Sequence, residues 1–172
     1  MALLLQLSPS SPETGAAPEP TAAAEIVFQP PEYYGEPNEN GSRFYEEAGK
    51  TVANLRILEQ EYPASGEDDS WKQAEIQRWM TLYQEDQRCV LIDGPNNIRD
   101  VEIAGAPGCA FDLQYRSADN PAVYSARFVL CRDAGNERLI HVVLYVFGES
   151  ERDLYGDFDA MIAGAEREVP AQ

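Results

Sequence analysis

The pattern of apolar and polar residues predicts an antiparallel sheet followed by an amphipathic helix in the second half of the chain. Residues 109–116 and 123–130 each carry an apolar face as half-buried strands do, residues 139–147 are apolar at almost every position, and short polar segments separate the three runs. After the third run, apolar residues recur on a single helical stripe. They are Leu154, Tyr155, Phe158, Met161, Ile162 and Ala165. We expect this helix to start near Ser150 and to pack on the sheet.

The first half of the chain adds strands and one more helix. The segment "SRFYEEAGKTVANLRILEQEYP" holds two β-rich runs broken at Gly49, which predicts a strand pair. Residues 70–87 mix apolar and charged positions at helical spacing, with Ser70 as the N-cap. "RCVLID" and "VEIAG" predict two further short strands. The fold class that follows is α+β, an antiparallel β-sheet with helices packed on it.

The register of the first predicted hairpin can be read from the sequence. Directly opposed residues of an antiparallel pair point to the same face of a sheet, so a correct register matches apolar with apolar positions. One register does so and also sets Asp112 opposite Arg127, whereas a shift of one residue brings Phe128 against Asp112. The expected apolar pairs are Cys109 with Leu130, Phe111 with Phe128, Leu113 with Ala126 and Tyr115 with Tyr124.

The same reasoning places the only histidine of the chain. In the second hairpin, which turns through residues 133–137, matching apolar positions pairs Leu130 with Ile140 and Phe128 with Val142. His141 then lies on the opposite, mixed face of the sheet. The candidate site residues gathered on that face are His141, Cys131, Arg127 and Asp112.

These candidates allow a structural and a catalytic interpretation. A histidine hydrogen-bonded near a sheet face is commonly structural, whereas Cys131 diagonal to His141 would suit a thiol nucleophile and its base. No cofactor or metal is predicted, because Cys89, Cys109 and Cys131 lack the paired spacing of zinc sites. We also expect no disulfide between Cys109 and Cys131, since the first register points them to opposite faces.

Composition and charge limit the partners. The chain carries 30 acidic and 13 basic side chains, a net charge of -17, which disfavours binding to nucleic acid or anionic lipid and leaves a basic protein partner open. Residues 1–24 are rich in Pro, Ser and Ala and predict a disordered leader or tether, followed by a single domain over 25–169 and a tail at 170–172. The apolar run "ALLLQL" lacks the basic residues with which an export signal begins. We expect the protein to be exported, with the start of its signal truncated in the recorded sequence. No segment predicts insertion of the domain into a membrane.

The order of elements resembles a known superfamily. Strands, a helix, an antiparallel meander, and then "LIHVVLYVFGES" followed by the helix "DLYGDFDAMIAGAE" are similar to the PsbP/DcrB-like group over roughly residues 40–168. The usual final "SF" of that helix is replaced by Gly164-Ala165-Glu166. The resemblance implies an α/β/α sandwich around an antiparallel sheet. Its members include extrinsic photosystem subunits, periplasmic or lipid-anchored bacterial proteins, a Ran-binding import factor and effector chaperones, all of which act by binding proteins.

Three hypotheses of function follow. The first is a non-enzymatic protein-binding domain that is exported or membrane-tethered, with a periplasmic, secreted or tethered location. The second is an intracellular adaptor or chaperone of apolar segments, which three unpaired cysteines favour. The third is an enzyme that uses Cys131 and His141. The partner expected for the first two is a basic or apolar protein.

Overall fold

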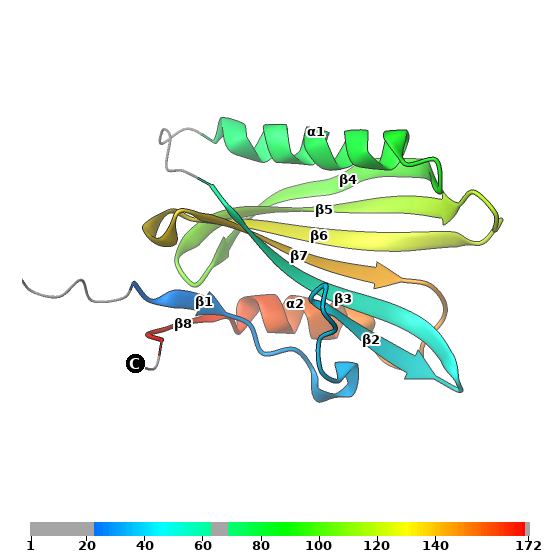
Figure 1. The fold of residues 1–172 in the computed structure, drawn as a ribbon, viewed down its shortest axis with the longest axis horizontal. Helices are drawn as coiled ribbons and strands as arrows, with labels where there is room; N and C mark the ends of the chain where they lie inside the picture. The colour runs from blue at the N-terminus through cyan, green and yellow to red at the C-terminus, as the bar shows by residue number, and fades with distance from the viewer. Residues whose placement is uncertain (1–22, 63–68, 171–172) are drawn as a thin grey trace, which may run out of the picture.

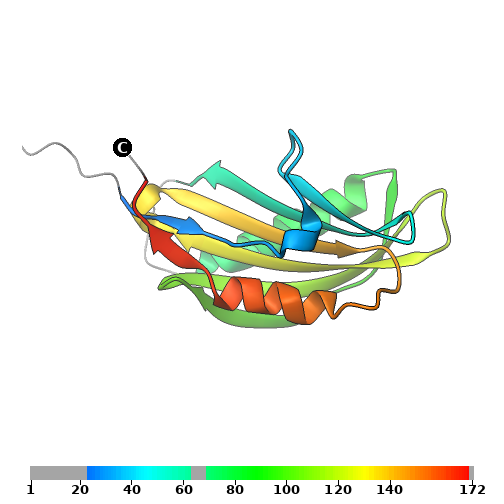
Figure 2. The same ribbon diagram turned by 90° about the horizontal axis from the view of Figure 1, so that it is seen from below.

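The protein is an antiparallel sheet with one helix on each face. The computed structural model describes residues 23–62 and 69–170. In Figure 1, α1 (Ser70–Glu85) lies along one side of the strands and α2 (Leu154–Ala163) along the other, and Figure 2 shows the same arrangement from below. The predicted α+β sandwich is therefore confirmed. The predicted leader lies almost wholly outside the described residues, as do the last two residues of the predicted tail.

The large sheet has six strands in the order β2-β3-β7-β6-β5-β4, and β1 pairs with β8 in a separate two-stranded ribbon. The strands are β1 (Glu25–Val27), β2 (Ser42–Glu47), β3 (Lys50–Glu61), β4 (Cys89–Ile103), β5 (Ala106–Ser117), β6 (Val123–Asp133), β7 (Arg138–Val146) and β8 (Glu166–Glu168), with short 3-10 turns η1 (Glu32–Tyr34) and η2 (Ala134–Asn136). Among the described residues, no helix is both long and apolar enough to cross a bilayer.

The predicted register of the first hairpin is confirmed. Asp112 lies opposite Arg127, and all four expected apolar pairs of β5 and β6 are present. Phe111 and Phe128 stack with their ring centroids 4.7 Å apart and nearly parallel. The apolar alternation and the ion pair agree on a single register, which explains why the sequence was sufficient here.

The predicted register of the second hairpin is wrong by one residue. Leu130 lies opposite His141, and Cys131 lies opposite Ile140. Because side chains alternate along a strand, this shift turns every side chain of β7 to the other face of the sheet. Strand β7 is apolar at almost every position and is covered on both faces, so its pattern fits either register. The geometry of the turn between β6 and β7 sets the register instead, and its residue Glu137 adopts the left-handed conformation at φ 51°.

Two buried clusters separate the faces of the sheet. The α1 side holds Cys109, Phe111, Phe128 and Leu130 against buried side chains of α1. On the α2 side, odd-numbered residues of β6 and even-numbered residues of β7 pack against the predicted apolar stripe of α2. That stripe is therefore confirmed as part of the core. The residues of that stripe that are buried are Leu154, Phe158, Met161, Ile162 and Ala165.

Three smaller expectations differ from the structure. The two short strands predicted around Gly94 are one long strand, β4, whose pairing with β5 shifts register at several points. Those bulges let the chain pass Pro95 without leaving the sheet. Helix α1 includes Ser70 in its first turn, with Asp69 in the N-cap position, and α2 is capped by Asp153, whose carboxylate accepts from the Gly156 N–H at 3.0 Å, rather than by Ser150.

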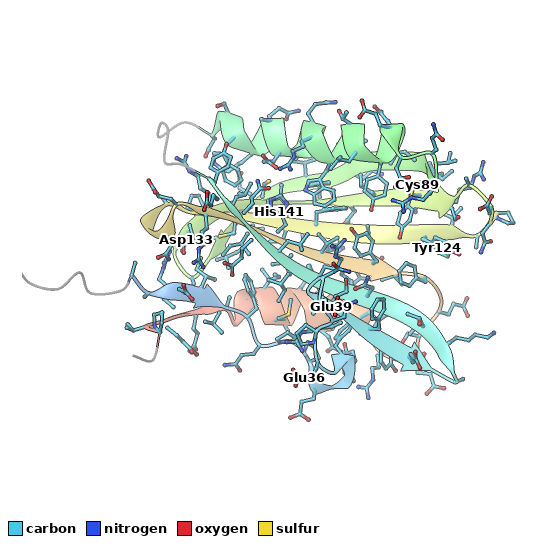
Figure 3. The ribbon with its side chains drawn as sticks, in the orientation of Figure 1. Glu36, Glu39, Cys89, Tyr124, Asp133 and His141 are labelled. Carbon is cyan, nitrogen blue, oxygen red and sulfur yellow. The ribbon has the colours of Figure 1, made fainter. Side chains whose placement is uncertain are left out.

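The turn between β6 and β7 is held by a buried carboxylate. Asp133 is 1% exposed and accepts hydrogen bonds from Asn136 Nδ2 at 2.6 Å and from Arg167 Nη2 at 3.0 Å. Asn136 Nδ2 also donates to the Ala24 carbonyl at 3.0 Å. Figure 3 places Asp133 at the end of the sheet where this turn lies. Asp133 thus joins the turn to the β1–β8 ribbon.

Removing this carboxylate should weaken the whole fold. We expect Asp133→Ala to lower the free energy of unfolding by about 2–3 kcal/mol, because it leaves a guanidinium and an amide without their charged acceptor. Urea denaturation measures the loss. Asp119→Ala, in the exposed β5–β6 loop, is the matched control and should change stability by less than about 0.5 kcal/mol. Equal losses in the two variants would contradict the role of Asp133.

Candidate functional site

The four candidate residues do not form one site. Cys131, Arg127 and Asp112 lie on the α2 side of the sheet, whereas His141 lies opposite Leu130 on the α1 side. The expected neighbourhood of Cys131 and His141 is therefore wrong, because it depended on the shifted register of β7. A thiol and an imidazole on opposite faces of a sheet cannot act as a nucleophile and its base. The catalytic hypothesis loses its geometric support.

Arg127 joins the sheet to α2. Its Nε donates to Asp112 at 2.9 Å, its Nη1 donates to Asp159 at 2.9 Å, and its guanidinium lies 4.6 Å from the centre of the Tyr155 ring. Partial burial raises the pKa of Asp112, but hydrogen bonds from Arg127 and Asn97 outweigh it and lower that pKa. Arg127 is engaged on all sides, which is the arrangement of a structural cation.

His141 is held by a tryptophan of α1. The indole Nε1–H of Trp79 donates to His141 Nδ1 at 3.0 Å, and His141 is only 4% exposed. Burial, with a smaller contribution from Arg78, lowers the pKa of His141 to about 4, so the ring is neutral at pH 7. An indole can only donate, so the neutral ring carries its proton on Nε2, for which no partner exists among the described side chains.

Two hollows lie beside α1, and Trp79 and Leu82 line both of them. One, of about 270 Å³, lies toward β3 and contains His141 in its wall. The other, of about 230 Å³, lies beneath the C-terminal end of α1. Leu82 is 47% exposed at their shared rim. The side chains that line the second hollow are Trp79, Leu82, Tyr83, Asp86, Cys89, Tyr115 and Tyr145.

Sequence reasoning missed most of these residues as candidates. Tyr115 and Tyr145 come from strands separated by β6, and Trp79 comes from a helix far away in the sequence. The helix itself offered one signal, since Trp79 and Tyr83 are four residues apart and so share one face. Nothing in the sequence shows that this face meets two tyrosines of the sheet.

The three cysteines are free thiols, and Cys109 and Cys131 point to opposite faces of the sheet, as the first register predicted. Cys109 lies beside Phe111 and Leu130 on the α1 side, and Cys131 lies on the α2 side. Burial raises the pKa of Cys109 to about 11 and that of Cys131 to about 12. In the described part of the chain, no three His, Cys, Asp or Glu side chains are placed to hold a metal ion.

Comparison with known proteins identifies the fold. No protein-family model matches the chain, and no curated protein sequence does. Among solved structures, LpqN, involved in cell envelope biogenesis of Mycobacterium tuberculosis, is similar over 89% of this chain and 87% of its own, with a TM-score of 0.55 and 8% identity. Cyanobacterial PsbP (CyanoP) from Synechocystis sp. PCC 6803 is similar over 93% of this chain and 98% of its own, with a TM-score of 0.51 and 15% identity. The chain shares the fold of these two proteins, one of them a PsbP, so the resemblance seen in the sequence is confirmed at the level of the fold.

Protonation of His141 should destabilise the protein in acid. Its pKa is about 4 in the folded chain against 6.5 when unperturbed, so the unfolded state binds the proton better. The neutral ring therefore contributes its full stabilisation above pH 6.5, and this stabilisation is lost as the pH falls to about 4. The free energy of unfolding should fall by about 3 kcal/mol over that range from this group alone. His141→Gln keeps an acceptor for Trp79 and should remove this loss. Carboxylates titrate in the wild type and in the variant alike, so the free energy of unfolding of both should be measured by urea denaturation between about pH 4 and pH 7. Equal pH dependence in the two proteins would contradict a role of His141.

The thiols should differ in reactivity. In the folded protein at pH 7 we expect iodoacetamide to label the partly exposed Cys89, more slowly than a free model thiol because burial also raises its pKa. Cys109 and Cys131 should be labelled only after unfolding in urea, because both are buried and protonated. Mass spectrometry of peptides measures each site. Rapid labelling of Cys131 in the folded protein would contradict the structure and would support the hypothesis of a reactive thiol at Cys131.

Proposed function

We propose that the protein is a non-enzymatic protein-binding domain that acts outside the cytoplasm, either exported or tethered to a membrane. The observation that carries the proposal is the unequal covering of the two faces of the sheet. The α2 side is packed by α2, the β1–β8 ribbon and η1. The α1 side has a single described helix, which packs mainly on side chains of β5, β6 and β7, and its buried cluster includes no side chain of β2 or β3.

The open part of the face is mixed in character. Asn54 of β3 lies directly opposite Phe44 of β2 on one side and Tyr145 of β7 on the other, so all three point to the α1 side. Phe44 is 45% exposed. The next residues of β3 on this side are Arg56, Leu58 and Gln60, each half-buried. Helix α1 borders the end of this row, since Arg78 donates to Gln60 at 2.9 Å and Leu58 lines a hollow with Trp79 and Leu82. Apolar and aromatic side chains interleaved with polar ones are typical of protein interfaces that also remain soluble when free.

Charge indicates the chemistry of the partner. A net charge of -17 attracts basic surfaces and repels acidic ones. The hollow beside β3 adds an apolar lining from Leu58, Trp79 and Leu82. We therefore infer a partner that presents basic residues around an apolar or aromatic side chain.

Similar proteins support the location. LpqN is involved in cell envelope biogenesis, and that involvement of a protein with the same fold favours an exported role here. The specific role within that setting is outside what a shared fold conveys.

An intracellular adaptor or chaperone of apolar segments is the second candidate. Three free cysteines favour it, because reducing compartments keep thiols unpaired. Fractionation of the source cells, followed by detection of the natural gene product, separates the two locations.

Photo-crosslinking tests the proposed surface. Benzoylphenylalanine replaces Phe44, and a matched variant carries it in place of Ile98, an aliphatic residue of β4 with similar exposure (53%). We expect the Phe44 probe, but not the Ile98 probe, to give a discrete protein adduct in source cells. Excess unlabelled wild-type protein should suppress the adduct, salt should weaken it, and a Phe44→Asp competitor should not suppress it. Adducts of equal yield at both positions, or turnover of a substrate by the purified protein, would overturn the proposal.

A further inference from the structure

Four aromatic side chains surround the hollow beneath the C-terminal end of α1. Trp79 and Tyr83 come from the helix, Tyr115 from β5 and Tyr145 from β7, and together they line a space of about 230 Å³. That space exceeds the volume of several water molecules, so it accommodates a compact group of several heavy atoms. In Figure 3 the labelled Cys89, which also lines the hollow, marks its place near the end of α1.

The aromatic walls stand at steep angles to one another. The rings of Tyr83 and Tyr115 are 5.2 Å apart with 60° between their planes, and those of Tyr115 and Tyr145 are 6.3 Å apart with 84° between theirs. Trp79 is fixed by its hydrogen bond to His141 and by packing 4.8 Å from Phe128. Rings of different orientation around one space are a preformed cage rather than a flat stack.

The electrostatics of this cage favour a cation. Each aromatic face carries the negative part of a quadrupole. Burial raises the pKa of Tyr83, Tyr115 and Tyr145, so the phenols stay neutral and keep their O–H groups. The hollow lies at the C-terminal, negative end of the dipole of α1. At its rim, hydrogen bonds from Arg88 lower the pKa of Asp86 to about 2, so that carboxyl is ionised, but the paired guanidinium of Arg88 offsets its charge and the aromatic faces carry the attraction.

The shortage of free acceptors indicates which cation fits. Asp86 is engaged by Arg88 Nε at 3.0 Å and Nη2 at 2.9 Å, and Tyr145 is hydrogen-bonded to Tyr83 and Arg56, so few acceptors remain for a new donor. A primary ammonium has three N–H groups to satisfy and a guanidinium has five, and burying them unpaired is costly. A quaternary ammonium has none and presents only methyl groups to the rings.

We propose that this hollow is an aromatic cage that binds a trimethylammonium group. The group is carried by a small molecule such as choline, by a phosphocholine head group or by a trimethylated lysine, all of which share this chemistry. The site adjoins the proposed docking surface and shares Trp79, Leu82 and Tyr145 with it, but binding of a trimethylammonium group does not require a protein on that surface.

A neutral isostere provides the decisive comparison. Choline and 3,3-dimethyl-1-butanol have the same shape, but a carbon atom replaces the charged nitrogen in the second. We expect saturable binding of choline to the full chain, seen as tryptophan fluorescence changes and as amide shifts at Leu82, Asp86 and Cys89, and binding of the alcohol at least about tenfold weaker. Equal affinities would show an apolar hollow without cation recognition, and the absence of saturable binding would also overturn the proposal.

Variants locate the binding to the cage. Tyr115→Phe keeps the aromatic face and should retain choline affinity within about twofold, whereas Tyr115→Leu keeps the apolar volume but loses the face and should weaken it about tenfold. Phe111→Leu is the control, because Phe111 is buried in the same cluster but does not line the hollow, and its choline affinity should stay unchanged. Unchanged affinity in Tyr115→Leu would overturn the assignment, and if that variant does not fold, the comparison with the neutral isostere still decides.

The three carriers are then compared in the wild-type protein. Titrations with choline, phosphocholine and N-acetyl-trimethyllysine amide, each against an analogue without the trimethylammonium group, show which carrier binds most tightly. Tighter binding of at least one carrier than of its analogue supports the cage. Equal binding of all three pairs would overturn it.

Discussion

The register between β6 and β7 is the constraint on which the rest of the structure depends. It is set at the turn, where the buried carboxylate of Asp133 accepts from Asn136 and from Arg167 of β8. Since β7 lies between β3 and β6, its orientation also fixes which side chains of β3 face α1, among them Leu58 opposite His141. One anchored turn therefore determines the composition of both faces over the centre of the sheet.

The two faces then differ in how completely they are covered. On the α2 side, Arg127 binds Asp112 of the sheet and Asp159 of α2, so charge as well as apolar burial holds that layer in place. On the α1 side, a single helix leaves β2 and the outer side of β3 open. A face that must remain soluble without a cover cannot be purely apolar, and on this side β3 carries Asn54, Arg56 and Gln60 beside Leu58, which satisfies that requirement.

The sequence predicted the layers and one hairpin well, and the limits of its prediction have physical causes. Asp112 and Arg127 mark the register of β5 and β6, because a charged pair fits only one alignment in an apolar strand. Strand β7 carries no such mark, so apolar matching alone could not separate two registers that bury equally apolar faces. Gly94 and Pro95 suggested the end of a strand, yet β5 continues to pair beyond them, because a bulged edge strand can omit hydrogen bonds that a central strand needs. The aromatic hollow was beyond prediction, since its walls come from four elements that only the tertiary fold brings together.

The single histidine in the most apolar strand has a structural explanation. When α1 packs on the sheet, the indole N–H of the half-buried Trp79 is turned toward the sheet and finds its acceptor there. A carboxylate there would bring a buried charge, whereas the imidazole of His141 offers an unprotonated nitrogen. The imidazole stays neutral at pH 7 because burial lowers its pKa to about 4. His141 therefore fixes the ring of Trp79, and that ring is a wall of both hollows beside α1. The residue that first suggested catalysis instead positions the aromatic surface on which binding at this side of the sheet would depend.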